Sequence, residues 1–446
     1  MHISNDRTNL PCRLAKGLVP LMAIMALVFV AVGCGPTRAP EPTGKRVASA
    51  QSAAQEQGVF KLGILGPFTG PSESTGREFK GAATMAFDAI NWQIGEYKIE
   101  PVWIDSQSDP DAAAEAYERA IVEEGIQAAI LNWHSSVAVA CMEVAAQYQI
   151  PHIFPYGATE VVNETFHSDP ERYGYWMNKG WPVPEKLSIS YVQAVQNAIA
   201  KGSWRPEEKT VAICGENTDW GLSFGASIKE QLEAEGWTTV AEEYFNLDEV
   251  QFYTMLNKFK ARNVALIAVT TTSPLSFAAF INQADELGLE SLIIADGLGW
   301  GGEWYEMTGT SSDYVIDQIP GWATAAGQDF ATDFEARWGV APSPSAAGLA
   351  YDGSNMFIQI AQNALAEHGE LASETIYTWA REKLQTGAWS YTDGIVMEAY
   401  KYLPGTLPDP LVGQGYYMFP VRQYFDGEGK IIYPPEWAEQ ELQPRP

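Results

Sequence analysis

The chain has 446 residues, of which 46% are hydrophobic, and carries 28 Lys and Arg against 56 Asp and Glu, a formal net charge of −28 at pH 7. This length allows two sizeable domains, each with its own core. Because so acidic a surface is repelled by phosphate backbones and anionic lipid headgroups, nucleic-acid binding is not expected.

The first 33 residues have the layout of a secretory signal peptide. Basic residues at Arg13 and Lys16 precede an uncharged run, 17–33, which is short for a membrane span and ends in small residues. The ending Ala31-Val32-Gly33-Cys34 resembles a bacterial lipobox, which implies that Cys34 becomes lipidated and starts the mature chain. We therefore expect an exported protein, lipid-anchored on the periplasmic or extracellular face of the cell membrane. An ordinary cleavage near an unmodified Cys34, or an uncleaved anchor, remains as an alternative.

The cysteine and histidine residues of the sequence do not indicate a metal site. Cys141 and Cys214 are expected to be free and on different lobes, although an exported protein allows a disulfide between them. No Cys or His pair has ligand spacing, so we predict no metal and no cofactor.

Residues 34–57 are rich in Pro, Ala, Thr, Ser and Gln and are predicted to be a flexible tether. Strand and helix patterns then alternate. The predicted strands of the first half are 60–65, 97–104, 128–131 and 152–154, and its predicted helices are 77–90, 109–123 and 135–148. A Trp-, Tyr- and Pro-rich stretch, 163–184, interrupts the alternation before a helix at 185–200.

The alternation then resumes. The second half has predicted strands at 210–214, 238–244, 264–269 and 291–295, and predicted helices at 222–235, 251–262, 274–287, 345–367 and 373–384. Short antiparallel strands are predicted at 416–419, 421–425 and 431–433. Two β-α-β-α runs predict an α/β protein with two doubly wound sheets, whose ligands lie at the carboxyl ends of the strands.

An ordered set of short motifs covers nearly all of this region. In chain order they are Gly66-Pro67-Phe68-Thr69-Gly70, Gly76, Gly81-Ala82, Ile90-Asn91, Asp105, Ser135-Ser136, Pro155-Tyr156-Gly157-Ala158-Thr159, Asp219-Trp220-Gly221, Asp296-Gly297 and Tyr351-Asp352. Their order and spacing resemble the type I periplasmic solute-binding proteins of ABC transporters, in the branched-chain amino acid (Leu/Ile/Val) class.

The resemblance implies two α/β lobes joined by three hinge crossings. Lobe I comprises 58–180 and 342–388, and lobe II comprises 200–340 and 389–446. It also implies a monomeric, non-enzymatic protein that captures a small amino-acid-like ligand between the lobes and delivers it to an ABC permease.

The predicted ligand site combines residues that follow strands. Ser135 begins a helix directly after a strand, where its hydroxyl and free backbone N–H groups favour a carboxylate. The resemblance implies that this position, with Ala158 and Thr159, holds the α-carboxylate and α-ammonium of an amino acid. On the facing lobe, Asp296 is expected to neutralise an ammonium group and Trp220 to line the side-chain pocket.

Departures from the family leave the ligand class open. Thr75 stands where branched-chain binders have a pocket aromatic residue, and Trp133 and His134 precede Ser135. The chain has 15 Trp and an aromatic insertion at 163–184. The candidate ligands are therefore an aliphatic or aromatic amino acid and, next to it, an amide or an aromatic carboxylate.

Two motifs imitate enzymes. Gly221-Leu222-Ser223-Phe224-Gly225 matches a nucleophile elbow, but Ser223 is predicted to lie inside a helix and not at a strand end. The run Gly297-Leu298-Gly299-Trp300-Gly301-Gly302 matches a dinucleotide fingerprint, but the helix that follows is too short to cross a sheet. A ligand sensor of the same fold, acting through a signalling receptor, remains an alternative to transport.

Overall fold

The computed structural model describes residues 58–322 and 324–446. The predicted signal peptide, Cys34 and the predicted tether lie outside the described residues. Within the described ranges, no helix combines the length and the apolar character needed to cross a membrane.

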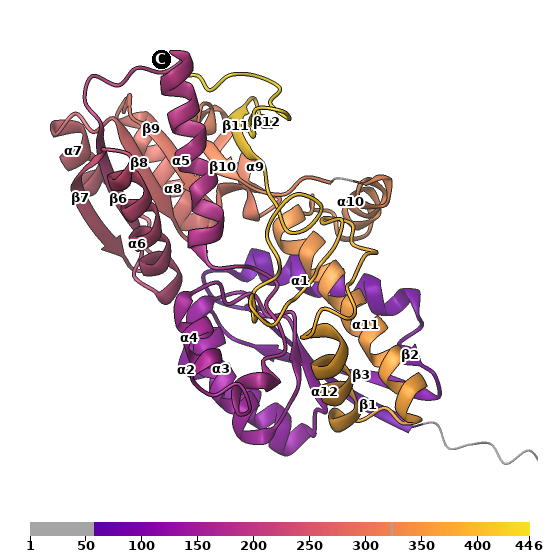
Figure 1. Cartoon of the computed structure of the whole chain (residues 1–446). Coiled ribbons are helices and arrows are strands. Elements are labelled where there is room, and N and C mark those ends of the chain that lie inside the picture. The colour runs from indigo at the N-terminus through magenta and orange to yellow at the C-terminus, as the bar shows by residue number, and fades with distance from the viewer. Residues whose placement is uncertain (1–57, 323) are drawn as a thin grey trace, which may run out of the picture. The chain divides into compact units, whose positions relative to one another are not determined.

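Lobe I is built on a five-stranded sheet (Figure 1). The strand order is β2 (Gln93–Ile94), β3 (Tyr97–Asp105), β1 (Gly58–Gly66), β4 (Ala128–Ile130) and β5 (His152–Ile153). All neighbours are parallel except the β2–β3 pair at one edge. In β1 the run Leu62–Leu65 is buried on both faces, as expected for a parallel strand covered by helices on both sides.

Two groups of helices cover this sheet. The helices are α1 (Glu73–Ala89), α2 (Pro110–Arg119), α3 (Ser135–Tyr148), α4 (Glu160–Ser168), α10 (Ala325–Trp338), α11 (Leu349–His368) and α12 (Ser373–Trp379). Helix α1 packs against α11, and α2 packs against α3. Lobe I therefore takes helices from both ends of the chain (Figure 1).

Lobe II is built on a seven-stranded sheet. Its order is β12 (Glu428–Tyr433), β11 (Val421–Phe425), β10 (Ile316–Gln318), β9 (Leu292–Asp296), β8 (Leu266–Thr270), β6 (Thr210–Glu216) and β7 (Thr238–Phe245). Its helices are α5 (Pro184–Lys201), α6 (Asp219–Ala234), α7 (Tyr253–Ala261), α8 (Pro274–Glu286) and α9 (Trp304–Thr308). The five strands from β7 to β10 are parallel, and β11 and β12 extend the sheet with antiparallel pairs.

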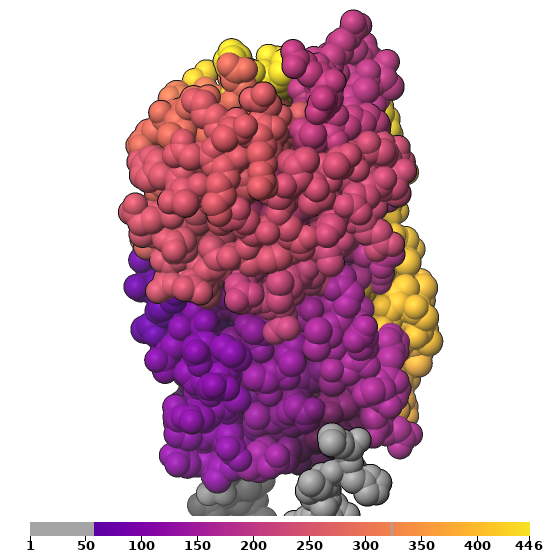
Figure 2. All heavy atoms as spheres, turned by 90° about the vertical axis from the view of Figure 1, so that its left-hand side faces the viewer, coloured from indigo at the N-terminus to yellow at the C-terminus, as the bar shows by residue number. Residues whose placement is uncertain are grey.

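The chain passes between the lobes three times. It leaves lobe I after α4, returns after β10, and leaves again after α12 to form β11 and β12. The two-lobe α/β architecture predicted from the motifs is thus confirmed. Figure 2 shows one face, on which the surface of lobe II (rose, above) meets that of lobe I (indigo and purple, below).

Corresponding glycines let the helix that follows the first strand of each lobe approach the end of that strand closely. A Cβ atom on Gly76 of α1 would lie 2.1 Å from the backbone oxygen of Pro67, and one on Gly221 of α6 would lie 1.9 Å from that of Glu216. Only glycine fits there, which explains why both lobes carry it at this point.

The prediction was wrong at several elements. Residues 416–419 form no strand; Tyr417 makes an isolated bridge with Val412, because left-handed glycines at Gly413 and Gly415 interrupt an extended chain. Helix α4 enters the stretch predicted to be irregular, because the Thr159 side chain accepts a hydrogen bond from the Val161 backbone N–H and caps the helix. Helix α10 was not predicted, and it packs against α1 of lobe I, although lobe II was expected to extend to residue 340.

Both described cysteines are free and buried, and they lie on different lobes as expected: Cys141 in α3 and Cys214 in β6.

Candidate functional site

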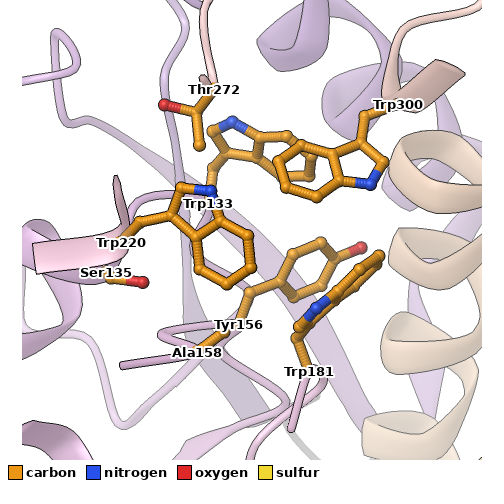
Figure 3. A pocket seen from close by; sticks show the side chains of 8 residues that line it. All are labelled: Trp133, Ser135, Tyr156, Ala158, Trp181, Trp220, Thr272 and Trp300. Atoms are coloured by element: carbon orange, nitrogen blue, oxygen red, sulfur yellow. The ribbon is translucent and has the colours of Figure 1, made fainter. Parts of the chain in front are cut away.

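Side chains from both lobes enclose a small aromatic cavity (Figure 3). Its lining residues are Trp133, Ser135, Tyr156, Ala158, Trp181, Trp220, Thr272 and Trp300. The free volume of the cavity in this arrangement of the lobes is about 20 Å³, little more than one water molecule needs. Five of the eight residues are aromatic and none is charged, so the cavity suits an apolar or planar ligand body.

Sheet topology brings these residues together. Trp133 and Ser135 follow β4 and Tyr156 and Ala158 follow β5 in lobe I, whereas in lobe II Trp220, Thr272 and Trp300 follow β6, β8 and β9. The carboxyl ends of parallel strands meet at one edge of each sheet, which is where α/β proteins bind ligands. Trp181 comes from the first hinge crossing.

Ser135 is the best-placed polar group on the lobe I side. It is the first residue of α3, a helix of 14 residues, and is buried. The N–H groups of the first helical turn have no partner within the helix, and the helix dipole adds partial positive charge there. A carboxylate or carbonyl oxygen of a ligand is favoured at this end of the cavity.

The lobe II wall is held rigidly by hydrogen bonds. The indole N–H of Trp220 donates to Oγ1 of Thr270 at 2.8 Å. The buried carboxylate of Glu216 accepts from the backbone N–H of Thr272 at 2.5 Å and from its hydroxyl at 2.8 Å. Since that hydroxyl is already bonded, Thr272 offers the cavity mainly its methyl group.

Trp300 occupies the centre of the aromatic cluster. Its ring centroid lies 5.6 Å from that of Trp133 and 5.4 Å from those of Trp181 and Trp220. These are ordinary edge-to-face and tilted aromatic contacts. Trp300 ends a short 3₁₀ turn, Leu298–Trp300, so the glycine-rich run that imitates a dinucleotide fingerprint serves to place an indole in the cavity.

Three indole groups of the cavity keep unused donors. The Nε1–H groups of Trp133, Trp181 and Trp300 are buried and have no hydrogen-bond acceptor in the described part of the chain. Because an indole nitrogen can only donate, only an acceptor that reaches these groups would satisfy them.

The structure brings together four of the seven residues predicted to contact ligand. Trp133, Ser135, Ala158 and Trp220 line the cavity; Thr75, Thr159 and Asp296 do not. Thr159 caps α4, and Thr75 is buried in α1 with its hydroxyl unpartnered among the described residues. Ligand contact by any of the seven stays a prediction.

Asp296 faces the interior of lobe II. Its carboxylate accepts a hydrogen bond from the Tyr191 hydroxyl at 2.6 Å. Burial raises the pKa of Asp296 to about 8, the Tyr191 bond opposes the rise, and nearby Asp317 adds to it. A protonated carboxyl that is bonded to Tyr191 is poorly suited to neutralise a ligand ammonium.

The sequence analysis gave no ligand role to Tyr156, Trp181, Thr272 and Trp300, which also line the cavity. Tyr156 lies in a quoted motif and Trp181 in the aromatic insertion, so both carried a signal. Trp300 was named only as part of the glycine-rich run 297–302, and Thr272 had no distinguishing pattern.

Glu78 of α1 forms a polar link between the lobes. Its buried carboxylate accepts from the backbone N–H of Gly302 in lobe II at 2.9 Å, from that of Ser343 at 2.7 Å and from that of Ala347 at 3.3 Å. Gly302 lies two residues after Trp300. Glu78 therefore anchors the segment that places Trp300 over the cavity.

A second link lies beside the cavity. The Ser72 hydroxyl donates to the backbone oxygen of Thr272 at 2.7 Å, and Nε2 of His134 lies 3.0 Å from the same hydroxyl oxygen. Since the hydroxyl proton is used, His134 donates from Nε2. Burial lowers the pKa of His134 to about 3, which keeps the ring neutral.

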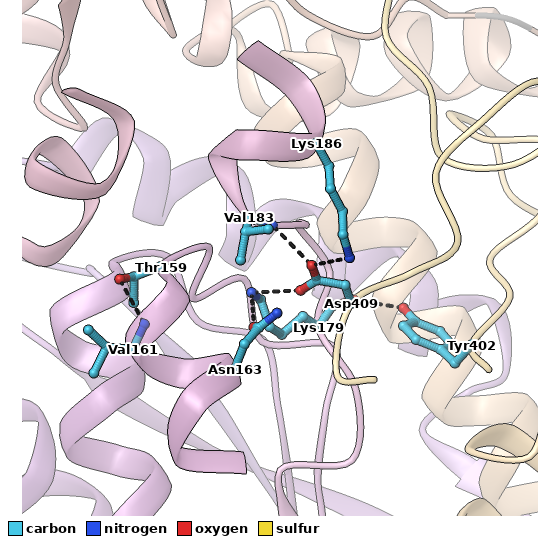
Figure 4. A network of polar contacts seen from close by, with 8 residues as sticks. All are labelled: Thr159, Val161, Asn163, Lys179, Val183, Lys186, Tyr402 and Asp409. Atoms are coloured by element: carbon cyan, nitrogen blue, oxygen red, sulfur yellow. Dashed lines mark hydrogen bonds and ion pairs between the residues drawn. The ribbon is translucent and has the colours of Figure 1, made fainter. Parts of the chain in front are cut away.

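A buried ion cluster joins two of the hinge crossings (Figure 4). Asp409 of the third crossing lies 2.8 Å from Nζ of Lys179 in the first crossing and 2.7 Å from Nζ of Lys186 in α5. The side chains of Asp409 and Lys179 are completely buried. Nζ of Lys179 also donates to Asn163, and the backbone oxygen of Lys179 accepts from the Tyr402 hydroxyl at 2.7 Å.

The two ammonium groups determine the charge of Asp409. Burial by itself raises the pKa of Asp409, but the charges of Lys179 and Lys186 outweigh it and hold the pKa below its ordinary value. Burial lowers the pKa of Lys179, and Asp409 opposes this change. The carboxylate is therefore charged at neutral pH.

The two enzyme-like motifs gain no support from the geometry. Ser223 lies inside α6 and not at a strand end.

In the described ranges, no group of three or more His, Cys, Asp or Glu side chains is arranged to hold a metal ion.

Comparison with known proteins places the chain in a family. Residues 59–388 match the family model described as periplasmic binding protein. The chain is 22% identical over 278 residues to the leucine-, isoleucine-, valine-, threonine- and alanine-binding protein of Pseudomonas aeruginosa, an alignment that covers 61% of this chain and 70% of that protein.

Solved structures share the fold. A putative branched-chain amino acid ABC transporter protein from Silicibacter pomeroyi matches with a TM-score of 0.70 at 20% identity, covering 87% of this chain and 99% of the other. A solute-binding protein of an ABC transporter from Rhodopseudomonas palustris, in complex with 3,4-dihydroxybenzoic acid, matches with a TM-score of 0.68 at 19% identity and the same coverage.

The fold and the cavity between two lobes are those of a two-lobed solute-binding protein. The chain belongs to the periplasmic binding protein family, type I, in the branched-chain amino acid class. Proteins of this family are exported and bind small molecules.

Replacing Glu78 tests the link between the lobes through its pH dependence. A carboxyl whose folded pKa is raised to about 8 binds a proton that the unfolded chain has released above about pH 4.3. Its contribution to stability therefore falls as pH rises towards 8. Glu78→Gln resembles the protonated form. The free energy of unfolding of the variant minus that of the wild type should therefore rise by up to ~1.4 kcal/mol per pH unit between about pH 5 and 8.

The measurement is urea unfolding of both proteins at four pH values. Glu100→Gln, in the exposed pair with Lys98, is the control and should run parallel to the wild type. Parallel curves for Glu78→Gln as well would show that Glu78 is already ionised in the folded protein.

Asp409→Asn should be strongly destabilising. The change leaves the buried ammonium group of Lys179 without a counter-charge, and breaking a buried pair in this way costs ~3–5 kcal/mol. Chemical denaturation near pH 7 measures the loss directly. A loss no larger than that of the Glu100→Gln control would contradict the assigned role of the ion cluster.

Proposed function

We propose that this protein is an exported lipoprotein, anchored through Cys34, that captures a small organic carboxylate between its lobes and delivers it to an ABC permease. The observation that carries the proposal is the aromatic cavity, to which both lobes contribute side chains. A ligand in this cavity touches lobe I and lobe II at once.

Several features of the cavity favour an aromatic or other apolar carboxylate over an α-amino acid. None of the eight lining residues is charged, so a ligand ammonium has no carboxylate partner among them. Asp296, the residue expected to supply one, is buried against Tyr191. Indole faces suit a planar ring, whereas Ser135, the start of α3 and the free indole N–H groups suit oxygen acceptors. The relative from Rhodopseudomonas palustris holds 3,4-dihydroxybenzoic acid.

Binding acts as a shift between an open and a closed arrangement of the lobes. A ligand that contacts both lobes interacts more strongly with the closed form and raises its population. The contacts of Glu78 and Ser72 with lobe II supplement those of the ligand in that form. The permease then recognises the closed protein.

A thermal melting screen tests the ligand class. We expect benzoate-like carboxylates to raise the melting temperature by a few degrees, because ligand at about 100 times its dissociation constant adds ~2.7 kcal/mol to stability. The panel contains aromatic acids, amides, aliphatic and aromatic amino acids, sugars and NAD. A shift with leucine or isoleucine and none with aromatic acids would restore the amino-acid interpretation; a shift with sugars or NAD alone would overturn the proposal.

Two substitutions test the site. Ser135→Ala should weaken binding of an active carboxylate by ~1.5–3 kcal/mol, the value of a hydrogen bond to a charged group, whereas Asp296→Asn should leave the affinity unchanged. Titration calorimetry measures both affinities. Ser136→Ala, one residue further along α3 and outside the cavity lining, is the matched control. Full affinity in Ser135→Ala, or a marked loss in Asp296→Asn, would contradict this assignment of the polar contacts.

A further inference from the structure

A second and larger cavity lies at the hinge, away from the aromatic cavity. We call it the hinge groove; its volume is about 980 Å³. Its walls come from the second crossing (319–322), the third crossing (396–398 and 414–420) and the β11–β12 hairpin, with α9 beside it (Figure 1). Its aromatic side chains are Trp304, Trp322, Tyr416, Tyr424 and Trp437.

Arg422 of β11 lies in this lining with part of its hydrogen-bonding capacity unused. Its Nη1 donates to the backbone oxygen of Gly429 at 2.9 Å. Its Nε is buried and has no acceptor in the described part of the chain. The edge of the guanidinium formed by Nε and Nη2 is the one that binds a carboxylate with two parallel hydrogen bonds.

No described carboxylate forms an ion pair with Arg422. Asp317 is its partner across the β10–β11 ladder, but it accepts from the backbone N–H groups of Gly297 and Gly299 and from the Tyr424 hydroxyl. Glu398, the other charged residue of the lining, is exposed. Burial lowers the pKa of the half-buried Arg422, and the charges of Glu439 and Asp317 oppose this change without either carboxylate pairing with it directly. An anion that reaches the guanidinium and bonds to it is therefore favoured.

We propose that the hinge groove is a second ligand site, for a small monocarboxylate with an apolar or aromatic body. The carboxylate pairs with the Nε–Nη2 edge of Arg422, and the body lies against the aromatic side chains of the groove. Glu398 selects against polyanions such as phosphate, because like charges in one groove repel.

Because of its position, a ligand in the hinge groove affects the equilibrium between the open and closed arrangements of the lobes. Its walls include segments of two of the three crossings, which must change shape if the lobes move. An anion there touches both segments, so its affinity differs between open and closed forms. By thermodynamic reciprocity, such a ligand also changes the affinity of the aromatic cavity.

Fluorine NMR of the purified protein with 4-fluorobenzoate tests the proposal. We expect a bound resonance that Arg422→Met abolishes and Trp220→Ala leaves in place. Arg422→Lys should weaken this binding at least ~10-fold, because an ammonium lacks the fork geometry. Glu398→Gln should strengthen it. Trp437→Ala, at an exposed groove residue outside the β-ladders, gives a second test should Arg422→Met fail to fold.

The outcomes separate this proposal from the proposed function. A resonance lost only in Trp220→Ala places the anion in the aromatic cavity alone and overturns the hinge site. A groove resonance without a cavity resonance supports the hinge site and counts against the proposed cavity ligand. Equal competition by phosphate and by benzoate for the groove resonance would overturn the proposed selectivity.

Discussion

The contact between Asp409 and two lysines is the interaction on which the relation of the two lobes depends. A carboxylate and an ammonium that are fully removed from water are tolerated only if they stay paired. Because Lys179 lies in the first crossing and Asp409 in the third, these crossings are tied to each other at one point. Lys186 extends the tie to the start of α5 in lobe II. A motion of the lobes that separated these groups would leave a buried charge unpaired.

The aromatic cavity lies between the carboxyl ends of the strands of the two sheets, which face each other. Each edge supplies residues that follow strands, and indole rings fill much of the space between them. The chemistry of the cavity follows from which polar groups are already bonded. Asp296 is bonded to Tyr191 and Thr272 to Glu216, whereas three indole donors are free. What remains for a ligand is a set of donors and aromatic faces, without an acidic group.

Trp300 links recognition to the arrangement of the lobes. The same short segment that brings its ring against three other indoles ends at Gly302, whose N–H is bonded to Glu78 of the opposite lobe. Closure thus positions one wall of the cavity through a backbone contact, and ligand binding and closure share a structural element. The hinge groove adds a route by which a second small anion acts on the same motion.

The sequence by itself determined the two α/β lobes, the family and part of the cavity. Alternating apolar strands and helices, with glycine at Gly76 and Gly221 and Ser135 after a strand, are local patterns that need no knowledge of distant contacts. The limits of the lobes and the lipid anchor at Cys34 remain predictions. Helix α10 was missed because its stability depends on packing against α1, where Phe334 lies over Gly81.

Only the tertiary structure decided which polar groups remain available to a ligand. Asp296 ends strand β9, where a ligand-binding residue could lie, but its carboxylate accepts a hydrogen bond from Tyr191, which is distant in sequence. Trp300 and Trp181, more than a hundred residues apart, meet in one cavity, and Arg422 lies at the hinge with its Nε unpartnered among the described residues. The reason is physical. The local sequence determines on which helix, strand or loop a side chain lies, whereas its hydrogen-bond partner comes from a segment that only folding brings near.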